Sequence, residues 1–390
     1  MRLSPRAAGL SGSITLTLAA RARALAAAGR DVVSMAVGEP DFDAPPLVRA
    51  AAHAAIDSGE VRYTPAAGLP ALRAALAAML TERRGVATTP DRVVVTHSGK
   101  HALSHALLAL VEPGDEVLLL LPAWSSYDEL VRFAGGVVRQ VAPRADAGPD
   151  FAALHAALSP RTRGIVLNTP SNPSGYVWGE AELRELMRIA RERDLWVISD
   201  EIYARLVYGA ARHVSPASLD DDARDRVVIV DGASKAYAMT GYRMGFLAGP
   251  AHIAKAVGEM QSQVSGCPNF VSQQAYLAGL VNDPPEMEAM RQAFDARRVR
   301  LYTGLRALGL DLVEPLGAFY AFPDVARFTD ERGVIGLCED ALEQEALALV
   351  PGTAFGMEGH VRLSYALAED RIDEALRRFG RVLARGRATT

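Results

Sequence analysis

Short apolar runs rich in β-branched residues alternate along the chain with longer stretches in which apolar residues recur every three or four positions. Such alternation predicts buried strands separated by helices. Seven runs have the length and composition of strands: 91–96, 115–121, 135–141, 163–168, 195–200, 226–232 and 244–249. The helical pattern is clear between them, as in GKHALSHALLALV and GEAELRELMRIARERD. We therefore predict an α/β fold in which helices cover both faces of a mostly parallel, seven-stranded sheet.

The pattern changes after about residue 285. A long arginine-rich helix over about 285–308, short strands around GAFYAF and HVRLSY, and a final helix are expected, which is typical of a smaller α+β domain. We expect an N-terminal arm with part of the small domain in residues 1–45, a large domain in 46–285, and the rest of the small domain in 286–390. Polar residues interrupt the mildly apolar N-terminus, so we expect an arm leading into a helix rather than a signal peptide.

Composition and charge narrow the class of protein. With 390 residues, 49% of them hydrophobic, the chain can bury a large core. The net charge of -4 comes with interspersed arginines and acids, which disfavours nucleic acid and membrane as partners. Cys267 and Cys338 cannot form a disulfide framework and lack metal-ligand spacing. We expect a cytoplasmic protein that acts on small molecules and needs no metal.

Lysine is rare in this chain, with only Lys100, Lys235 and Lys255 among 42 Lys and Arg residues. Arginine stays protonated, whereas lysine can lose its proton and form an imine with an aldehyde. Lys235 follows the predicted strand 226–232, and Ser234 and Arg243 lie close to it in sequence. These three residues could converge on one phosphorylated aldehyde. The alternative for each lysine is an ordinary surface position.

Polar residues also follow other predicted strands. Ser98 and Gly99 lie in a turn that opens onto a helix, where backbone N–H groups can hold a phosphate, although plain turn chemistry explains them equally well. Asp200 ends the strand 195–200. It could pair with a protonated ring nitrogen while Tyr203 donates to a ring oxygen, or it could simply cap the next turn.

The order of these motifs resembles that of a known family. GEPDF (38–42), YTPAAG (63–68), THSGK (96–100), PAW (122–124), NTPSNPSG (168–175), SDEIY (199–203), SKAYAMTGYRMGF (234–246) and VRLSYA (361–366) occur in sequence. The chain resembles the fold-type I, pyridoxal-phosphate-dependent aminotransferases of class I/II from about Ser13 to the last helix. Within that family it is most similar to the bacterial aspartate and aspartate/prephenate aminotransferases.

The resemblance implies pyridoxal 5'-phosphate as cofactor, bound by the large domain, and a role for each matching residue. Lys235 would bind the cofactor as an imine and shuttle the proton, and Asp200 would keep the ring nitrogen protonated. The other cofactor contacts that it implies are Tyr203 and Asn172 at the ring oxygen, Trp124 on the ring face, Ser98, Gly99, Lys100, Ser234 and Arg243 at or near the phosphate, and Tyr63 reaching across from a second subunit. It also implies cis bonds at Leu121-Pro122 and Asn172-Pro173.

The resemblance further implies how a substrate binds. Arg362 would clamp the α-carboxylate, with Asn172 beside it and Gly38 leaving room for close approach. Residues 259–270 contain no arginine, whereas animal-type aspartate aminotransferases have there the arginine that binds the distal carboxylate. Lys100, with Ser13 and Thr15 nearby, would take over this role. Tyr242 stands where relatives usually have tryptophan, and Lys255 matches no motif, so we expect it on the surface.

These implications predict a homodimeric aminotransferase with ping-pong chemistry. We expect aspartate or glutamate as amino donor and 2-oxoglutarate or oxaloacetate as acceptor. The alternatives are another donor, such as an aromatic amino acid, prephenate or a specialised biosynthetic substrate, and a pyridoxal-phosphate-dependent lyase on the same fold. A non-catalytic cofactor-binding regulator is disfavoured, because no DNA-binding extension precedes residue 13. A nicotinamide dehydrogenase is also disfavoured, because the first strand is not followed by a three-glycine fingerprint.

Overall fold

Seven strands form one sheet in the computed structural model, which describes residues 2–10, 12 and 14–386, without the side chains of residues 5 and 14–16. The strand order is β2-β8-β7-β6-β5-β3-β4. The strands are β2 (Val93–Thr96), β3 (Glu116–Leu120), β4 (Val137–Val141), β5 (Thr162–Asn168), β6 (Trp196–Asp200), β7 (Val227–Gly232) and β8 (Gly245–Ala248). Only β8 runs antiparallel to its neighbours, so the predicted mostly parallel sheet is confirmed.

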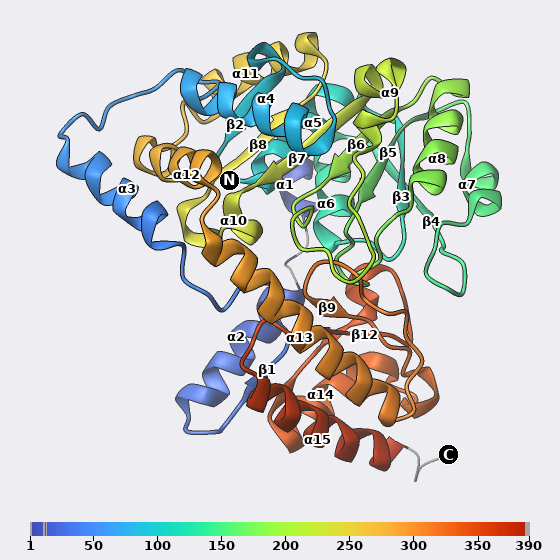
Figure 1. Cartoon of the computed structure of the whole chain (residues 1–390). Helices are drawn as coiled ribbons and strands as arrows, with labels where there is room; N and C mark the ends of the chain where they lie inside the picture. The colour runs from blue at the N-terminus through green and yellow to red at the C-terminus, as the bar shows by residue number, and fades with distance from the viewer. Residues whose placement is uncertain (1, 11, 13, 387–390) are drawn as a thin grey trace.

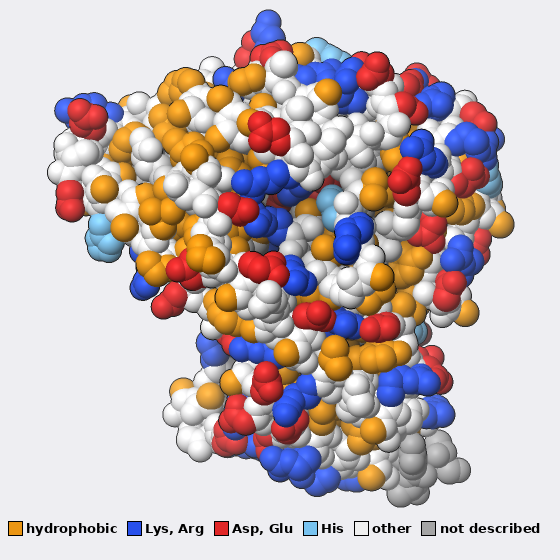
Figure 2. All heavy atoms as spheres, in the orientation of Figure 1, with side chains coloured by type: hydrophobic (Ala, Val, Ile, Leu, Met, Phe, Trp, Pro, Cys, Tyr) orange, Lys and Arg blue, Asp and Glu red, His pale blue; other side chains and the backbone are white. Residues whose placement is uncertain are grey.

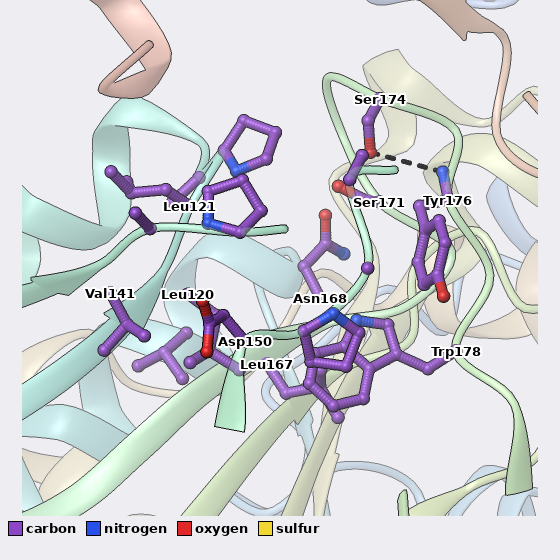
Figure 3. Close-up of a pocket in the computed structure, with 18 of the residues that line it drawn as sticks. Leu120, Leu121, Val141, Asp150, Leu167, Asn168, Ser171, Ser174, Tyr176 and Trp178 are labelled. Carbon is purple, nitrogen blue, oxygen red and sulfur yellow. Dashed lines mark hydrogen bonds between the residues drawn. The ribbon is translucent and has the colours of Figure 1, made fainter. Parts of the chain in front are cut away.

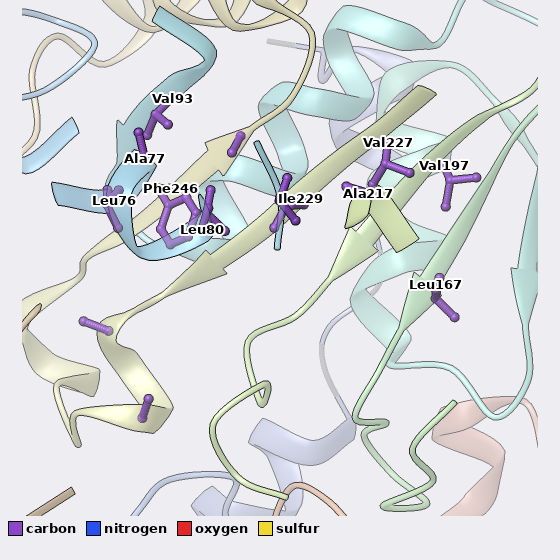
Figure 4. Close-up of a cluster of buried hydrophobic side chains, with 14 of the residues drawn as sticks. Leu76, Ala77, Leu80, Val93, Leu167, Val197, Ala217, Val227, Ile229 and Phe246 are labelled. Atoms are coloured by element: carbon purple, nitrogen blue, oxygen red, sulfur yellow. The ribbon is translucent and has the colours of Figure 1, made fainter. Parts of the chain in front are cut away.

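Helices cover both faces of this sheet. One face packs on α4 (Pro70–Arg84), α8 (Glu180–Glu192) and α12 (Phe270–Asn282), and the other on α5 (Gly99–Leu110), α6 (Ser125–Ala134) and α11 (Ala251–Val264). Alternate residues of a strand point to opposite faces, so Ile229 of β7 joins the first core and Val230 the second. Figure 4 shows Ile229 and Phe246 of the sheet with Leu76 and Leu80 of α4.

The N-terminal and C-terminal parts of the chain build a smaller unit below the sheet (Figure 1). Its long helices are α2 (Ile14–Ala27), α13 (Pro285–Ala307), α14 (Gly333–Glu345) and α15 (Glu369–Gly386). Its strands are β1 (Val33–Ser34), β9 (Tyr320–Ala321), β10 (Leu347–Ala348), β11 (Val350–Pro351) and β12 (Val361–Ser364), paired as β1-β10 and β11-β12-β9. The predicted long helix, final helix and two strands are confirmed, whereas the boundaries at residues 45 and 285 stay a prediction.

The remaining α-helices of the described residues are α1 (Pro5–Ala8), α3 (Pro46–Asp57), α7 (Phe151–Ala157), α9 (Asp221–Arg226) and α10 (Ala233–Ala236). The two predicted cis bonds, Leu121-Pro122 and Asn172-Pro173, are confirmed, and Thr169-Pro170 is also cis. Among the described residues, no helix has the length and apolar character needed to cross a membrane.

The sheet places its functional loops toward the smaller unit. β2, β5, β6 and β7 run in the same direction, so their carboxyl ends meet at one edge. Loops at that edge of a parallel sheet are the usual place for a ligand site. Thr96, Asn168, Asp200 and Gly232 end these four strands.

Phe246 provides a test of the core. Its side chain is fully buried in the cluster between the sheet and α4, so replacing it with alanine leaves a cavity. We expect Phe246→Ala to lower the free energy of unfolding by about 3–5 kcal/mol, measured by urea denaturation. Val299→Ala, at a half-exposed position on α13, should change it by less than about 0.5 kcal/mol; similar losses in both variants would contradict this assignment of the core.

Candidate active site

Most of the residues singled out in the sequence line one cavity of about 310 Å³. It lies between the carboxyl ends of the strands and the smaller unit. The residues that it brings together are Gly38, Ser98, Gly99, Lys100, Trp124, Asn172, Asp200, Tyr203, Ser234, Lys235, Arg243 and Arg362. They come from segments spread over more than three hundred positions of the chain, and only the fold makes them neighbours.

Three predicted residues are not placed in this cavity. Tyr63 lies in the long segment between α3 and α4 at the outer edge of the molecule (Figure 1), and 98% of it is exposed. Ser13 lies outside the described residues, and Thr15 belongs to α2 but its side chain is not described. The surface position expected for Lys255 is confirmed by its exposed side chain, which pairs with Glu259 at 3.8 Å.

Lys235 lies on α10, directly after β7, with its amine inside the cavity. The Nζ atom donates a hydrogen bond to the Gly38 carbonyl oxygen at 2.5 Å. Burial lowers the pKa of Lys235 to about 8, although the charge of Glu39 opposes this effect. An amine with such a pKa is partly neutral near pH 7, which attack on an aldehyde requires.

Asp200 ends β6 with its carboxylate buried at the same cavity. The Tyr127 hydroxyl donates to Oδ2 at 2.8 Å, and the Ile202 N–H donates to Oδ1 at 3.1 Å. Burial raises the pKa of Asp200 to about 6 in spite of these two donors. No arginine, lysine or histidine pairs with it in the described part of the chain, so this acid is free to bind a cationic group.

Arg362 on β12 is a buried cation without an anionic partner among the described residues. Its Nη1 donates to Asn172 Oδ1 at 3.1 Å and its Nη2 to the Ala36 carbonyl oxygen at 2.7 Å, while Nε has no partner. Burial lowers the pKa of its guanidinium. By contrast, the buried Arg298 and Arg378 each pair with two carboxylates. Arg362 is therefore suited to bind an anion that enters the cavity.

A second place for an anion lies at the start of α5. The Ser98 hydroxyl accepts a hydrogen bond from the His101 N–H at 3.2 Å and caps this helix, whose N-terminus favours negative charge. Arg243 also lines the cavity and donates to the Thr240 carbonyl oxygen at 2.8 Å. β8 comes so close that a Cβ on Gly245 would overlap the backbone of Ser98 and Gly99. The glycine thus allows a close-packed turn of the kind that holds a phosphate.

Several lining residues were not predicted from the sequence. They are Glu39, Tyr127, Asn168, Ile202, Thr240 and Tyr320. Four of these stand inside the quoted motifs: Glu39, Asn168, Ile202 and Thr240. Asn168 connects two predicted residues, because it donates to the Asp200 carbonyl oxygen at 3.0 Å and accepts from the Asn172 N–H at 2.8 Å. GAFYAF indicated only a strand at Tyr320, and no local pattern marked Tyr127.

A smaller cavity shares Tyr127 and Asn168 with the candidate site. Figure 3 shows it between the apolar side chains of Leu120, Leu167 and Trp178. Its volume of about 30 Å³ suits a water molecule and no larger ligand. The 310 Å³ cavity is the candidate active site because the predicted lysine, carboxylate and arginines meet there.

The family model for aminotransferase class I and II matches residues 30–379. The chain belongs to this family. Members use pyridoxal 5'-phosphate, so the protein is a pyridoxal-phosphate-dependent aminotransferase of fold type I, as the resemblance implied. The family match favours an aminotransferase over a cofactor-binding regulator or a nicotinamide dehydrogenase.

Similar proteins are named for related activities. The aspartate/prephenate aminotransferase of Thermus thermophilus is 42% identical over 388 residues, covering 98% of this chain and 99% of that one. The aspartate aminotransferase of Geobacillus stearothermophilus is 38% identical, again covering 98% and 99% of the two chains. The solved structure of the Thermus thermophilus aspartate aminotransferase with maleate superimposes with a TM-score of 0.94 at 41% identity, covering 98% of this chain and all of that one.

The residues of the cavity fit the cofactor by their chemistry. A partly neutral lysine suits its aldehyde, a buried unpaired carboxylate suits its ring nitrogen, and a capped helix start with an arginine suits its phosphate. Lys235, Asp200 and Arg243 have only neutral hydrogen-bond partners and form no ion pair among the described residues.

Gly245 gives a test of this fit. A methyl group in Gly245→Ala would displace the Ser98–Gly99 turn, so we expect the aminotransferase to bind pyridoxal phosphate at least about tenfold more weakly, the loss of roughly one hydrogen bond. Cofactor affinity can be measured by titrating the apoprotein and following absorbance. Gly241→Ala, where a Cβ would meet nothing within 4 Å, is the matched control. Equal affinities in both variants would rule out this turn as the phosphate site.

Proposed function

We propose that this aminotransferase moves amino groups between acidic amino acids and their 2-oxo acids. The donor is aspartate or glutamate, the acceptor is 2-oxoglutarate or oxaloacetate, and the two half-reactions follow each other in a ping-pong sequence. The observation that carries the proposal is the buried, unpaired guanidinium of Arg362 in a cavity that Lys100 also lines. Two cations in one cavity suit a substrate with two carboxylates.

Arg362 receives the α-carboxylate. A buried charge without a counter-ion is costly, and a carboxylate bound through two parallel hydrogen bonds removes that cost. The bonds to Asn172 and Ala36 hold the guanidinium in place before the substrate arrives. The Arg362 guanidinium lies over the Tyr320 ring. Position 38 is a glycine because a Cβ there would come within 2.6 Å of the Tyr320 hydroxyl.

Lys100 receives the distal carboxylate. Its ammonium lies 4.5 Å from the centre of the Trp124 ring, and it has no ion pair within the described structure. Burial and the charge of Arg243 lower the pKa of Lys100, which indicates that an added negative charge would stabilise its protonated form. The names of the similar enzymes, which include aspartate, support an acidic substrate. The prediction that Ser13 and Thr15 assist stays untested.

The chain's own groups divide the chemistry. Bound pyridoxal phosphate supplies an aldehyde and an electron-withdrawing ring that stabilises negative charge at the substrate's α-carbon. The Lys235 amine removes the proton from this carbon and returns a proton to complete the transfer. Asp200 holds the proton on the ring nitrogen, because its carboxylate pairs with no cation in the part of the chain that the structure describes.

The remaining residues orient the reactants. Tyr203 and Asn172 donate toward the ring oxygen, and Trp124 covers the ring face. Ser98, Gly99, Ser234 and Arg243 hold the phosphate, and Lys100 stands beside them at the cavity wall. All of these side chains or backbone groups line the same cavity, so no change of fold is needed to bring them to one ligand.

A homodimer completes the site in this proposal. Tyr63 is almost fully exposed, and several apolar side chains are exposed as well: Leu47 and Ile56 on α3, Val61, Val264 on α11 and Val281 on α12. Figure 2 shows apolar side chains gathered over α3, α4 and α12. A second copy would cover this surface and receive Tyr63 at its cofactor phosphate. The free cysteines Cys267 and Cys338 favour a cytoplasmic location.

Lys235→Ala tests the assignment of the amine. The variant should lose transamination by several orders of magnitude while still binding pyridoxal phosphate, because the phosphate and ring contacts persist. In the unmodified protein, borohydride should fix the cofactor to the peptide that contains Lys235, as read by mass spectrometry. Lys255→Ala, on the surface, is the matched control and should retain activity. Cofactor fixed to Lys100 or Lys255 would disprove the assignment.

Lys100→Ser tests the acidic substrate. Losing a charge-assisted hydrogen bond worth roughly 1.5–3 kcal/mol should lower kcat/KM for aspartate and 2-oxoglutarate about ten- to hundredfold. Alanine and phenylalanine have no distal charge, so their values should change little.

The same donor panel separates the alternatives. Equal losses for acidic and neutral donors would mean that Lys100 serves the phosphate instead, and would remove the acidic specificity. Faster turnover of aromatic donors would favour the aromatic alternative. Faster turnover of prephenate would favour the prephenate activity in the name of the Thermus thermophilus relative. Pyruvate and ammonia formed without any 2-oxo acid acceptor would indicate a lyase.

A further inference from the structure

Tyr320 occupies the point where three segments of the cavity meet. It lies on β9 with its side chain fully buried, and it lines the cavity. Its hydroxyl is 2.9 Å from the Tyr203 hydroxyl. The Arg362 guanidinium lies over its ring, 4.5 Å from the centre. Gly38 of the N-terminal segment packs against its hydroxyl so closely that a Cβ would come within 2.6 Å.

The two phenols carry two protons but share one hydrogen bond. Within the described structure, neither hydroxyl has another hydrogen-bond partner, so one of the two protons is left to point into the cavity. Each hydroxyl has a single proton to donate. If Tyr203 donates to the cofactor's ring oxygen, then Tyr320 must be the donor between the two phenols.

The position of Arg362 favours a hydrogen bond donated from Tyr320 to Tyr203. Burial raises the pKa of both phenols. The guanidinium opposes this rise most directly at Tyr320, whose ring it covers. The more acidic of two phenols is the better donor, so the charge over the Tyr320 ring favours donation from Tyr320 to Tyr203. Tyr203 is then left with its own proton for the cavity.

We propose that Tyr320 is a positioning residue that joins the two ends of the active site. Its hydroxyl donates to Tyr203 and thereby directs the Tyr203 proton toward the cofactor's ring oxygen. Its ring supports Arg362 in the orientation that binds the α-carboxylate. The inference rests on the proposed roles of Tyr203 and Arg362, and it adds a residue that reaches the cofactor and the substrate only through these two.

Tyr320→Phe tests the hydroxyl while keeping the ring. In the holoenzyme, the measurement is the pH midpoint of the visible absorbance change of the bound cofactor, which responds to hydrogen bonding at the ring oxygen. Tyr203→Phe should shift this midpoint. Tyr320→Phe should shift it in the same direction but less, by about 0.4–1 pH unit, the range expected for one neutral hydrogen bond. The double variant should match Tyr203→Phe alone, because Tyr320 acts through Tyr203.

Tyr320→Leu tests the ring. Losing the contact under the guanidinium should raise KM about two- to fivefold for acidic and neutral donors alike, since every donor has an α-carboxylate. Tyr320→Phe keeps this contact and should leave KM close to that of the unmodified enzyme. Equal KM values in the Phe and Leu variants would overturn the part of the proposal that concerns Arg362.

Tyr365→Phe is the matched control. Tyr365 belongs to the same buried cluster as Tyr320 and donates to the Ala318 carbonyl oxygen at 3.2 Å, but it does not line the cavity. Its variant should leave the midpoint unchanged. An equal shift in the Tyr365 and Tyr320 variants, or an additional shift in the double variant, would overturn the proposed bond to Tyr203.

The outcomes also separate this inference from the function on which it rests. If Tyr203→Phe moves the midpoint and Tyr320→Phe does not, the inference about Tyr320 is wrong and the role of Tyr203 stands. If neither variant moves it, the proposed contact of Tyr203 with the cofactor is itself wrong, and the inference falls with it.

Discussion

Arg362 carries a permanent positive charge into the interior at the junction of the two units, and no carboxylate of the described structure neutralises it. The fold must therefore hold it with neutral acceptors, which are Asn172 Oδ1 and the Ala36 carbonyl oxygen. These two bonds tie β12 to the turn after β5 and to the N-terminal segment. The position for an anion is thus built before any ligand binds, and the surrounding residues are arranged around it.

Two neighbouring acids at the end of β6 differ in whether they form ion pairs, and this difference determines which of them can bind a cationic ligand. Asp200 and Glu201 are both buried, but alternate residues of a strand face opposite sides of the sheet. The Glu201 carboxylate lies 2.9 Å from His213 Nε2 and 2.8 Å from Arg84 Nη1. These neighbours lower the pKa of Glu201 to about 2 in spite of burial. Asp200 pairs with no cation among the described residues, and burial raises its pKa to about 6. Only Asp200 is left to bind a positive ring nitrogen.

The division of the chain into two units gives the site a further property. Lys235, Asp200 and the Ser98–Gly99 turn belong to the large sheet and its loops, whereas Tyr320 and Arg362 belong to the smaller unit. The bond between Tyr203 and Tyr320 crosses this junction. Hydrogen bonds across a junction make the relative position of the two units part of the catalytic geometry.

The seven strands of the large sheet and the helices between them could be predicted from the sequence, because strand and helix periods and turn residues are local properties. The class of chemistry came from the resemblance that the ordered motifs carry, since the local patterns left ordinary structural roles open. The sequence also indicated Lys235, Asp200 and Arg362 through the order of motifs. Only the tertiary structure showed that Tyr127 donates to Asp200 and that Tyr320 meets Tyr203, since these contacts join residues 73 and 117 positions apart. Whether a carboxylate or guanidinium finds a counter-charge depends on such distant neighbours. Folding therefore determines which buried charges are free to react, because ion pairing depends on proximity in space.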